Sequence, residues 1–283
     1  MPFLLALASA VFYGSADFVG GLVSRRLAAI PVVLVSQAAG LVVVVLLLPL
    51  LPAASPTTAD FWWGAAAGLA GGTGVALLYH ALAIGTMSVV APTTAVAAVT
   101  IPVVASIALG ERPGLLAMFG IVLGIGAIIL VSQQNSSLST DGARARSLGV
   151  GTALGAGVAV GFFLLTLAQT RAAAGMWPLV AARGVSVTLI GLVAVARRTS
   201  LRMTPRLGAL TVVCGLVDML ANALYMLAAQ TGPLSPVVTL SSLYPATTVL
   251  LARAVLGERL NAWQSAGVVC ALIAVVLIVA GGS

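Results

Sequence analysis

Ten long apolar runs, separated by short polar breaks, follow one another along this chain. An α-helix rises about 1.5 Å per residue, so roughly 20 apolar residues cross the hydrocarbon core of a bilayer, which is about 30 Å thick. Each run is therefore predicted to form one membrane-spanning helix. The predicted spans are 3–22, 31–51, 62–83, 89–109, 114–132, 148–168, 177–196, 207–229, 235–256 and 262–280.

The composition excludes a water-soluble domain. Of the 283 residues, 61% are apolar and 7% are charged, whereas soluble domains carry about 25% charged residues. All 13 basic residues are arginines, most of them at the edges of apolar runs. That distribution is typical of anchoring beside anionic lipid headgroups and not of nucleic-acid binding. We expect an all-α, multi-pass protein of the cell membrane (plasma or inner membrane), whose surroundings are the lipid bilayer.

The chain also repeats itself. The sequence Leu-Gly-Glu-Arg at Leu109–Arg112 recurs 147 residues later at Leu256–Arg259. The same offset aligns Gly14 with Gly161, Pro31 with Pro178, Gly68 with Gly215, Gly85 with Gly232, Ser88 with Ser235 and Gly120 with Gly267. Chance agreement between low-complexity helices does not readily reproduce a charged motif at matching helix ends. We predict a first five-helix repeat at 1–132, a polar linker at 133–147 and a second five-helix repeat at 148–283.

Because each repeat has an odd number of spans, the second repeat enters the membrane upside down relative to the first. Inverted repeats are a recurrent plan of secondary carriers, which hold their substrate near the midplane between the two halves. The loops after spans 1, 5, 7 and 9 carry most arginines outside the spans, whereas the opposite side carries Arg112 and Arg171. The positive-inside rule makes the arginine-rich side cytoplasmic and turns both termini outward.

Several short motifs resemble those of a known family. They are Gly110-Glu111 and Gly257-Glu258 at the ends of the fourth and ninth spans, Tyr13-Gly14-Ser15 in the first span and Tyr244-Pro245 in the ninth. With these motifs and two five-helix repeats, the chain resembles the drug/metabolite transporter superfamily, specifically its ten-helix EamA-type members. The resemblance implies a central cavity lined by helices 1, 3, 4, 6, 8 and 9, with helices 5 and 10 peripheral. It also implies solutes such as amino acids, amines or nucleobases, often exported, and termini that are cytoplasmic, opposite to the arginine count.

Ionisable groups inside spans are costly to desolvate, so each is a candidate for function. Asp218 lies near the middle of the eighth span and shares one helix face with Asn222 and Tyr225. This stripe is typical of a cavity wall, but Asp218 could instead form a structural ion pair with Arg183 of the seventh span. Arg183 could equally bind a substrate carboxylate. Burial favours the neutral form of a carboxyl group, so Asp218, together with Asp17, is our candidate for a proton or substrate-cation site.

Asp17 shares a face of the first span with Ser9 and Tyr13, and its alternative role is a helix-end carboxylate beside an interfacial arginine. Four aromatic or imidazole side chains could stack against an amphipathic solute: Tyr79, His80, Tyr225 and Tyr244. A lone histidine is more often structural. Glu258 and Arg259 are expected to be a short-range charge pair that anchors a loop.

No nucleophile and base pair, metal-ligating cluster or P-loop motif occurs in the sequence. We therefore expect no catalytic residues, no metal, no cofactor and no direct use of ATP, and an intramembrane enzyme is disfavoured. The favoured function is a monomeric secondary-active carrier that moves a small polar or amphipathic metabolite by alternating access, with protons as a possible coupling ion. A membrane-embedded sensor or assembly partner without transport is the alternative.

Overall fold

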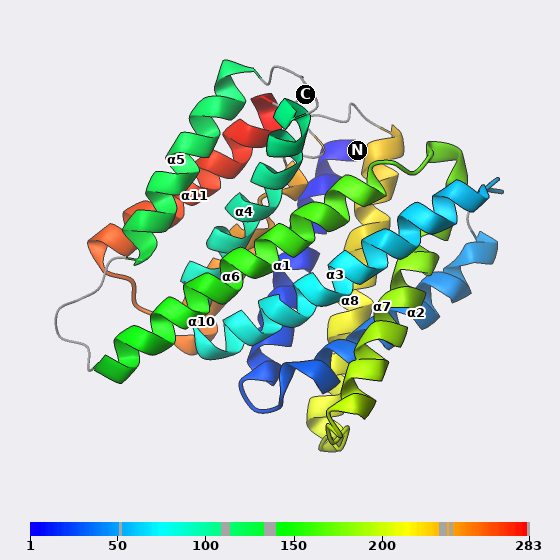
Figure 1. Cartoon of the computed structure of the whole chain (residues 1–283), viewed down its shortest axis with the longest axis horizontal. Helices are drawn as coiled ribbons and strands as arrows, with labels where there is room; N and C mark the ends of the chain where they lie inside the picture. Colours follow the sequence, from blue (N-terminus) through cyan, green and yellow to red (C-terminus); the bar gives the residue numbers. More distant parts are fainter. Residues whose placement is uncertain (51–52, 109–113, 133–139, 232–236, 238–239, 282–283) are drawn as a thin grey trace.

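The computed structural model describes residues 1–283 except 51–52, 109–113, 133–139, 232–236, 238–239 and 282–283. The described residues form helices joined by short connections, with no strand among them (Figure 1). The helices are α1 (Pro2–Ser24), α2 (Ala29–Leu47), α3 (Thr58–Ile84), α4 (Met87–Ala108), α5 (Leu115–Ser132), α6 (Thr140–Leu167), α7 (Trp177–Ala196), α8 (Pro205–Thr231), α10 (Tyr244–Leu256) and α11 (Ala262–Gly281), with short 3-10 turns η1 (Leu48–Leu50) and η2 (Ala172–Ala174). Each predicted span overlaps one of these helices, although residues 235–236 and 238–239 of the ninth span lie outside the described residues. The all-α class is confirmed.

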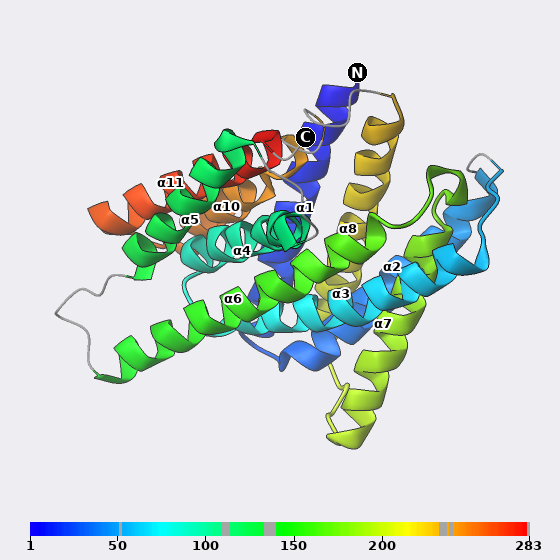
Figure 2. The same ribbon diagram turned by 45° about the horizontal axis from the view of Figure 1, so that its top comes forward.

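Seven of the described helices are long and apolar enough to cross a membrane. The other three correspond to shorter apolar segments within α4, α5 and α10, at Met87–Ile101, Leu115–Leu130 and Tyr244–Leu256. Both ends of the chain lie at the same end of the bundle (Figures 1 and 2). A chain that crosses the membrane an even number of times ends on the side on which it began.

Two boundaries differ from the prediction. The linker predicted at 133–147 is partly helical, because α6 begins at Thr140. The good helix formers Ala143 to Arg146 allow the helix to extend beyond the apolar span that nucleates it. The ninth span, predicted as one helix over 235–256, is interrupted by a turn at 242–243, and α10 begins at Tyr244. Pro245 occupies the first turn of α10, the one helical position that tolerates its missing N–H.

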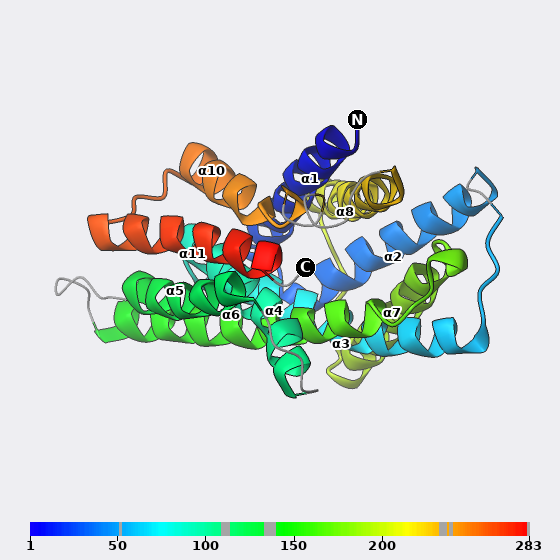
Figure 3. The same cartoon turned by 90° about the horizontal axis from the view of Figure 1, so that it is seen from above.

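Helices of one repeat pack mainly against helices of the other. In the first repeat, α3 packs on α6 and α7, and in the second its counterpart α8 packs on α1 and α2. Likewise α4 packs on α6 and α10 on α1, while α5 pairs with α11 and α2 with α7. The α5–α11 pair lies at one edge of the bundle and α2 and α7 at the other (Figure 3). The two repeats therefore interlock about a pseudo-twofold relationship and share one interior.

Glycines allow these inter-repeat contacts to be close. A Cβ added to Gly14 would overlap α10 at the Tyr244 carbonyl, and one added to the matching Gly161 would overlap α4 at Ile101. Small residues of this kind let membrane helices approach backbone to backbone. The sequence offset of 147 residues thus corresponds to equivalent packing in space.

Candidate functional site

The seventh, eighth and second helices meet through Arg183. Its guanidinium donates through Nη2 to the Asp218 carboxylate of α8 and through Nη1 to the Gln37 side-chain carbonyl of α2. The Arg183 side chain is 13% exposed and that of Asp218 is 26% exposed, while Gln37 is buried. A charged group at this depth needs a compensating partner, and the pair neutralises both. The structure thus brings together the two candidates that the sequence placed in neighbouring spans.

The three residues of the stripe predicted on α8, Asp218, Asn222 and Tyr225, make different contacts. Asn222 is buried and donates through Nδ2 to the Asp218 backbone carbonyl at 2.8 Å, so its amide bonds within its own helix. Tyr225 packs beside a small apolar cluster of Ala6, Ala228 and Val237. Of the three, the side chain of Asp218 alone takes part in the network with Arg183.

Asp17 lies on α1, partly buried, and has no hydrogen bond or ion pair with any described residue. It lies within electrostatic range of Asp218, Tyr13, Tyr79 and Tyr244. The alternative of a contact with an interfacial arginine is not seen: Arg25 at the end of α1 instead pairs with Glu258. Asp17 is therefore a carboxylate near Asp218 that has no cationic partner among the described residues.

Two tyrosines lie near this carboxylate. The rings of Tyr13 on α1 and Tyr244 on α10 meet edge to face, with centroids 6.3 Å apart and planes inclined by 61°. Tyr13 also lies within electrostatic range of both Asp218 and Arg183. Because α10 begins at Tyr244, the interruption of the ninth span lies beside Gly14, one turn from Asp17. Broken helices at membrane depth are typical of places where a carrier binds its solute.

Tyr79 forms a closed contact between three helices. Its hydroxyl lies 3.2 Å from Cys214 Sγ, and the Cys214 thiol donates to the Ala16 carbonyl, also at 3.2 Å. Since the thiol proton is used there, the Tyr79 hydroxyl donates to the sulfur. Tyr79 is 3% exposed and its ring lies against Gly20. It closes the packing between α1, α3 and α8.

His80 is separate from this group. It follows Tyr79 on α3, but its side chain is exposed on the outer surface of the bundle. One residue along a helix turns the side chain by about 100°, which moves it from the interior to the surface. His80 is therefore the predicted site residue that lies on the surface, away from Asp17, Arg183 and Asp218.

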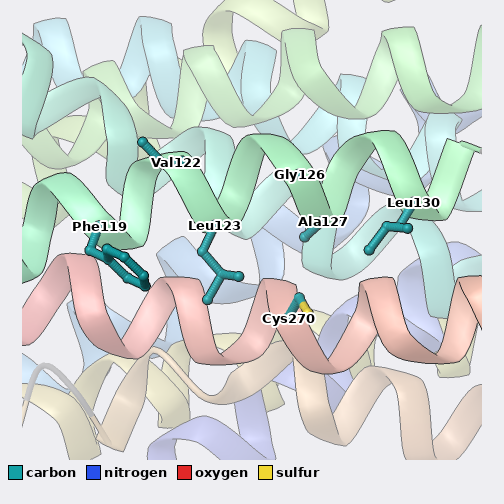
Figure 4. A pocket seen from close by; sticks show the side chains of 7 residues that line it. All are labelled: Phe119, Val122, Leu123, Gly126, Ala127, Leu130 and Cys270. Carbon is teal, nitrogen blue, oxygen red and sulfur yellow. The ribbon is translucent and has the colours of Figure 1, made fainter.

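A cavity of about 240 Å³ opens between α5 and α11 (Figure 4). Its lining is apolar: Phe119, Val122, Leu123, Gly126, Ala127, Leu130 and Cys270. Phe119 and Val122 are each 68% exposed, so this groove faces the lipid. It contains none of the charged residues described above and offers nothing to a polar solute. Among the described residues no group of three or more histidine, cysteine or acidic side chains could hold a metal ion.

Gln37 and Cys214 take part in these contacts but were not predicted from the sequence. The cavity helices implied by the family resemblance also did not include α2 and α7, which supply Gln37 and Arg183. A signal was available: at the repeat offset, Arg183 corresponds to Ser36, directly before Gln37, and α2 packs against α7. An amide in the middle of an apolar run is itself a mark of an interior polar contact.

Interlocked inverted repeats, an interrupted ninth span and a charged group inside the bundle are features of a membrane transporter fold. The model of the EamA-like transporter family matches the chain at residues 1–133 and 147–280. The chain belongs to that family, and with it to the drug/metabolite transporter type of multi-pass membrane protein. A search of the curated proteins found no match.

Proposed function

We propose that this protein is a secondary carrier that moves a small amphipathic amine, or a related metabolite bearing an ammonium group, across the membrane by alternating access. The observation that carries the proposal is the difference between two carboxylates. Asp218 is neutralised by Arg183, whereas Asp17 has no cationic partner among the described residues. When Asp17 is ionised, the group of Asp17, Asp218 and Arg183 carries one negative charge in excess, which a proton or a bound cation would balance.

Burying an unpaired charge costs free energy, so the excess carboxylate favours binding of a cation. An unpaired carboxylate inside a membrane protein is unfavourable unless a proton or another cation neutralises it. A substrate ammonium and a proton would then compete for the same oxygen atoms of Asp17. Such competition is a simple basis for proton-coupled export, because each cation displaces the other when the site faces the opposite side.

The aromatic surroundings also favour a cation with apolar parts. Tyr13 and Tyr244 offer ring faces and edges near Asp17, and cations are attracted to aromatic faces. An amine with a hydrocarbon portion would use both the carboxylate and the rings. A strongly hydrated metal ion would make little use of them.

The interlocked repeats support alternating access within one chain. Inverted repeats expose a central site to either side by rocking against each other. The two repeats already supply the inverted pair, which supports a monomer as the working unit.

A second candidate ligand is a carboxylate bound by Arg183, as in an amino acid or organic acid. It is supported by the position of Arg183 near Tyr13. It is less favoured because the guanidinium is already occupied by Asp218 and Gln37, and a substrate would have to displace both. A sensor without transport would bind solute at the same place but give no flux.

The proposal is tested with purified protein, first by ligand-induced thermal stabilisation and then by flux into proteoliposomes. A ligand at 100 times its Kd stabilises the folded state by about 2.7 kcal/mol. We expect amines to stabilise the native protein and the control His80→Gln, and to lose this effect in Asp17→Asn. Full retention of amine binding by Asp17→Asn would contradict Asp17 as the cation site, and stabilisation by carboxylates alone would contradict the proposed substrate class. Amine binding without flux would support the sensor.

A further inference from the structure

Glu258 joins three separate parts of the bundle at the arginine-rich end. It lies in the connection between α10 and α11, and its carboxylate accepts hydrogen bonds from the backbone amides of Met87 at 3.0 Å and Ser88 at 2.9 Å. These amides begin α4, where the first N–H groups have no partner within the helix. The same carboxylate forms an ion pair with Arg25 at 3.0 Å. Glu258 is therefore not simply paired with its neighbour Arg259, as the sequence suggested.

Arg25 extends this cluster to α3. Its guanidinium also donates to the carbonyl oxygen atoms of Leu82, at 3.5 Å, and Gly85, at 3.3 Å, at the end of that helix. The Glu258 side chain is only 10% exposed. Hydrogen bonds between charged groups and buried amides are among the stronger ones in proteins. We call Arg25, Glu258 and the amides of Met87 and Ser88 the Glu258 clasp.

The clasp lies beyond a layer of tightly packed side chains. Leu82 and Met87 are fully buried. A Cβ on Gly21 of α1 would lie 2.7 Å from Leu82 Cβ and 3.0 Å from Met87 Cε, so these helices touch without space between them. Tyr79 closes the same interface one turn closer to the centre, against Gly20. Asp17 is about two helical turns from Arg25 along α1, so the layer and the clasp separate Asp17 from the arginine-rich end.

The clasp connects the two repeats. Glu258 belongs to the second repeat, and its partners belong to the first. Relative movement of the repeats must therefore break it. Gly257, directly before Glu258, has a left-handed backbone (φ 64°, ψ 26°) and ends α10. Such helix-terminal positions absorb the backbone changes of a hinge.

We propose that the Glu258 clasp is the gate that closes the arginine-rich end of the transport path, and that the path opens when Glu258 releases Arg25 and the α4 amides. The inference rests on the alternating-access carrier proposed above. It assigns to Glu258 and Arg25 a conformational task that is separate from solute binding at Asp17. In the described structure the clasp is formed.

The gate is tested by the accessibility of a single cysteine at Ser88. This side chain is fully buried, its hydroxyl has no hydrogen-bond partner, and cysteine is nearly isosteric with serine. The native thiols are removed as Cys214→Ser, which keeps a donor for Ala16, and Cys270→Ala. A membrane-impermeant maleimide is applied to either side of sealed vesicles. A separate variant, Ser200→Cys, carries its cysteine at an exposed position of the arginine-rich side. The fraction of this variant that is labelled gives the fraction of protein whose arginine-rich side faces the reagent.

We expect Glu258→Gln and Arg25→Gln to raise the rate of labelling at Ser88→Cys at least tenfold, from the arginine-rich side alone. Arg26→Gln is the matched control, because Arg26 is exposed and its side chain contacts none of these groups. An unchanged rate in both variants, or equal acceleration by Arg26→Gln, would overturn the gate. If Glu258→Gln does not elute as a folded protein, Arg25→Gln carries the test, since it leaves the α4 amides bound. Labelling is measured without solute, so failure of the carrier proposal appears separately, as absent flux.

Discussion

Arg183 on α7 and Asp218 on α8 form an ion pair inside the helical bundle, and Gln37 on α2 completes it. The three residues together connect one helix of the first repeat with two of the second. Within the described part of the chain, the pairing also leaves Asp17 as the carboxylate of this region that has no cationic partner.

Removing one partner of the Arg183–Asp218 pair should destabilise the protein more than removing both. Asp218→Asn or Arg183→Gln alone leaves one charge uncompensated, and breaking a buried pair costs about 3–5 kcal/mol. We expect the lower end of this range, because the Asp218 side chain is 26% exposed. The double variant should recover a large part of the loss. Thermal unfolding of the four proteins in a double-mutant cycle measures the coupling, and additive losses would contradict it.

The affinity for amines should fall as the solution becomes more acidic. A proton and an ammonium group compete for the Asp17 carboxylate, so a higher proton concentration displaces the amine. The neighbouring tyrosines Tyr13, Tyr79 and Tyr244 are neutral at physiological pH, and Asp218 is paired with Arg183. Titration calorimetry between about pH 5 and pH 8 is the measurement. Any amine binding retained by Asp17→Asn should not depend on pH, and a dependence equal to that of the native protein would exclude Asp17 as the shared site.

Asp60 should be required for stability at the end of the bundle opposite the clasp. Its carboxylate accepts hydrogen bonds from the Thr57 amide at 2.8 Å and from the Arg171 amide at 2.9 Å, and it forms an ion pair with the Arg171 guanidinium. These contacts connect the start of α3 with the connection between α6 and α7. Asp60→Ala should lower the midpoint of thermal unfolding, whereas Thr58→Ala, at an exposed neighbour, should not. Equal midpoints for the two variants would show that this contact adds nothing.

Close packing at Gly68 should not tolerate a methyl group. A Cβ there would overlap the Ala182 carbonyl and lie 2.9 Å from Val185 Cβ. Forcing extra volume into a packed interface costs about 1–3 kcal/mol, so Gly68→Ala should unfold at lower temperature. Gly151 is the control, because a Cβ there meets nothing within 4 Å, and Gly151→Ala should be neutral or stabilising. Comparison of the two midpoints of thermal unfolding tests the close contact between α3 and α7, and equal midpoints would contradict it.

The sequence by itself determined the membrane fold and its duplication. Hydrocarbon admits helices only if every backbone group is bonded within them, so span length and polarity are recorded locally in the chain. This is why the bounds of α7 agree with the prediction at both ends. The offset that aligns Gly14 with Gly161 likewise reports equivalent packing, because backbone contact between helices permits only small residues.

The tertiary structure alone decided which polar groups meet. Asp17, Gln37, Arg183 and Asp218 come from four helices, and their pairing depends on the rotation and depth of each helix in the bundle. A sequence pattern places a residue on a face but does not say what that face meets. For the same reason His80 and Tyr79, adjacent in sequence, lie on the surface and in the interior. Glu258 was visible as a helix-end charge, but only packing brings it to Arg25 and the start of α4, because those contacts cross from one repeat to the other.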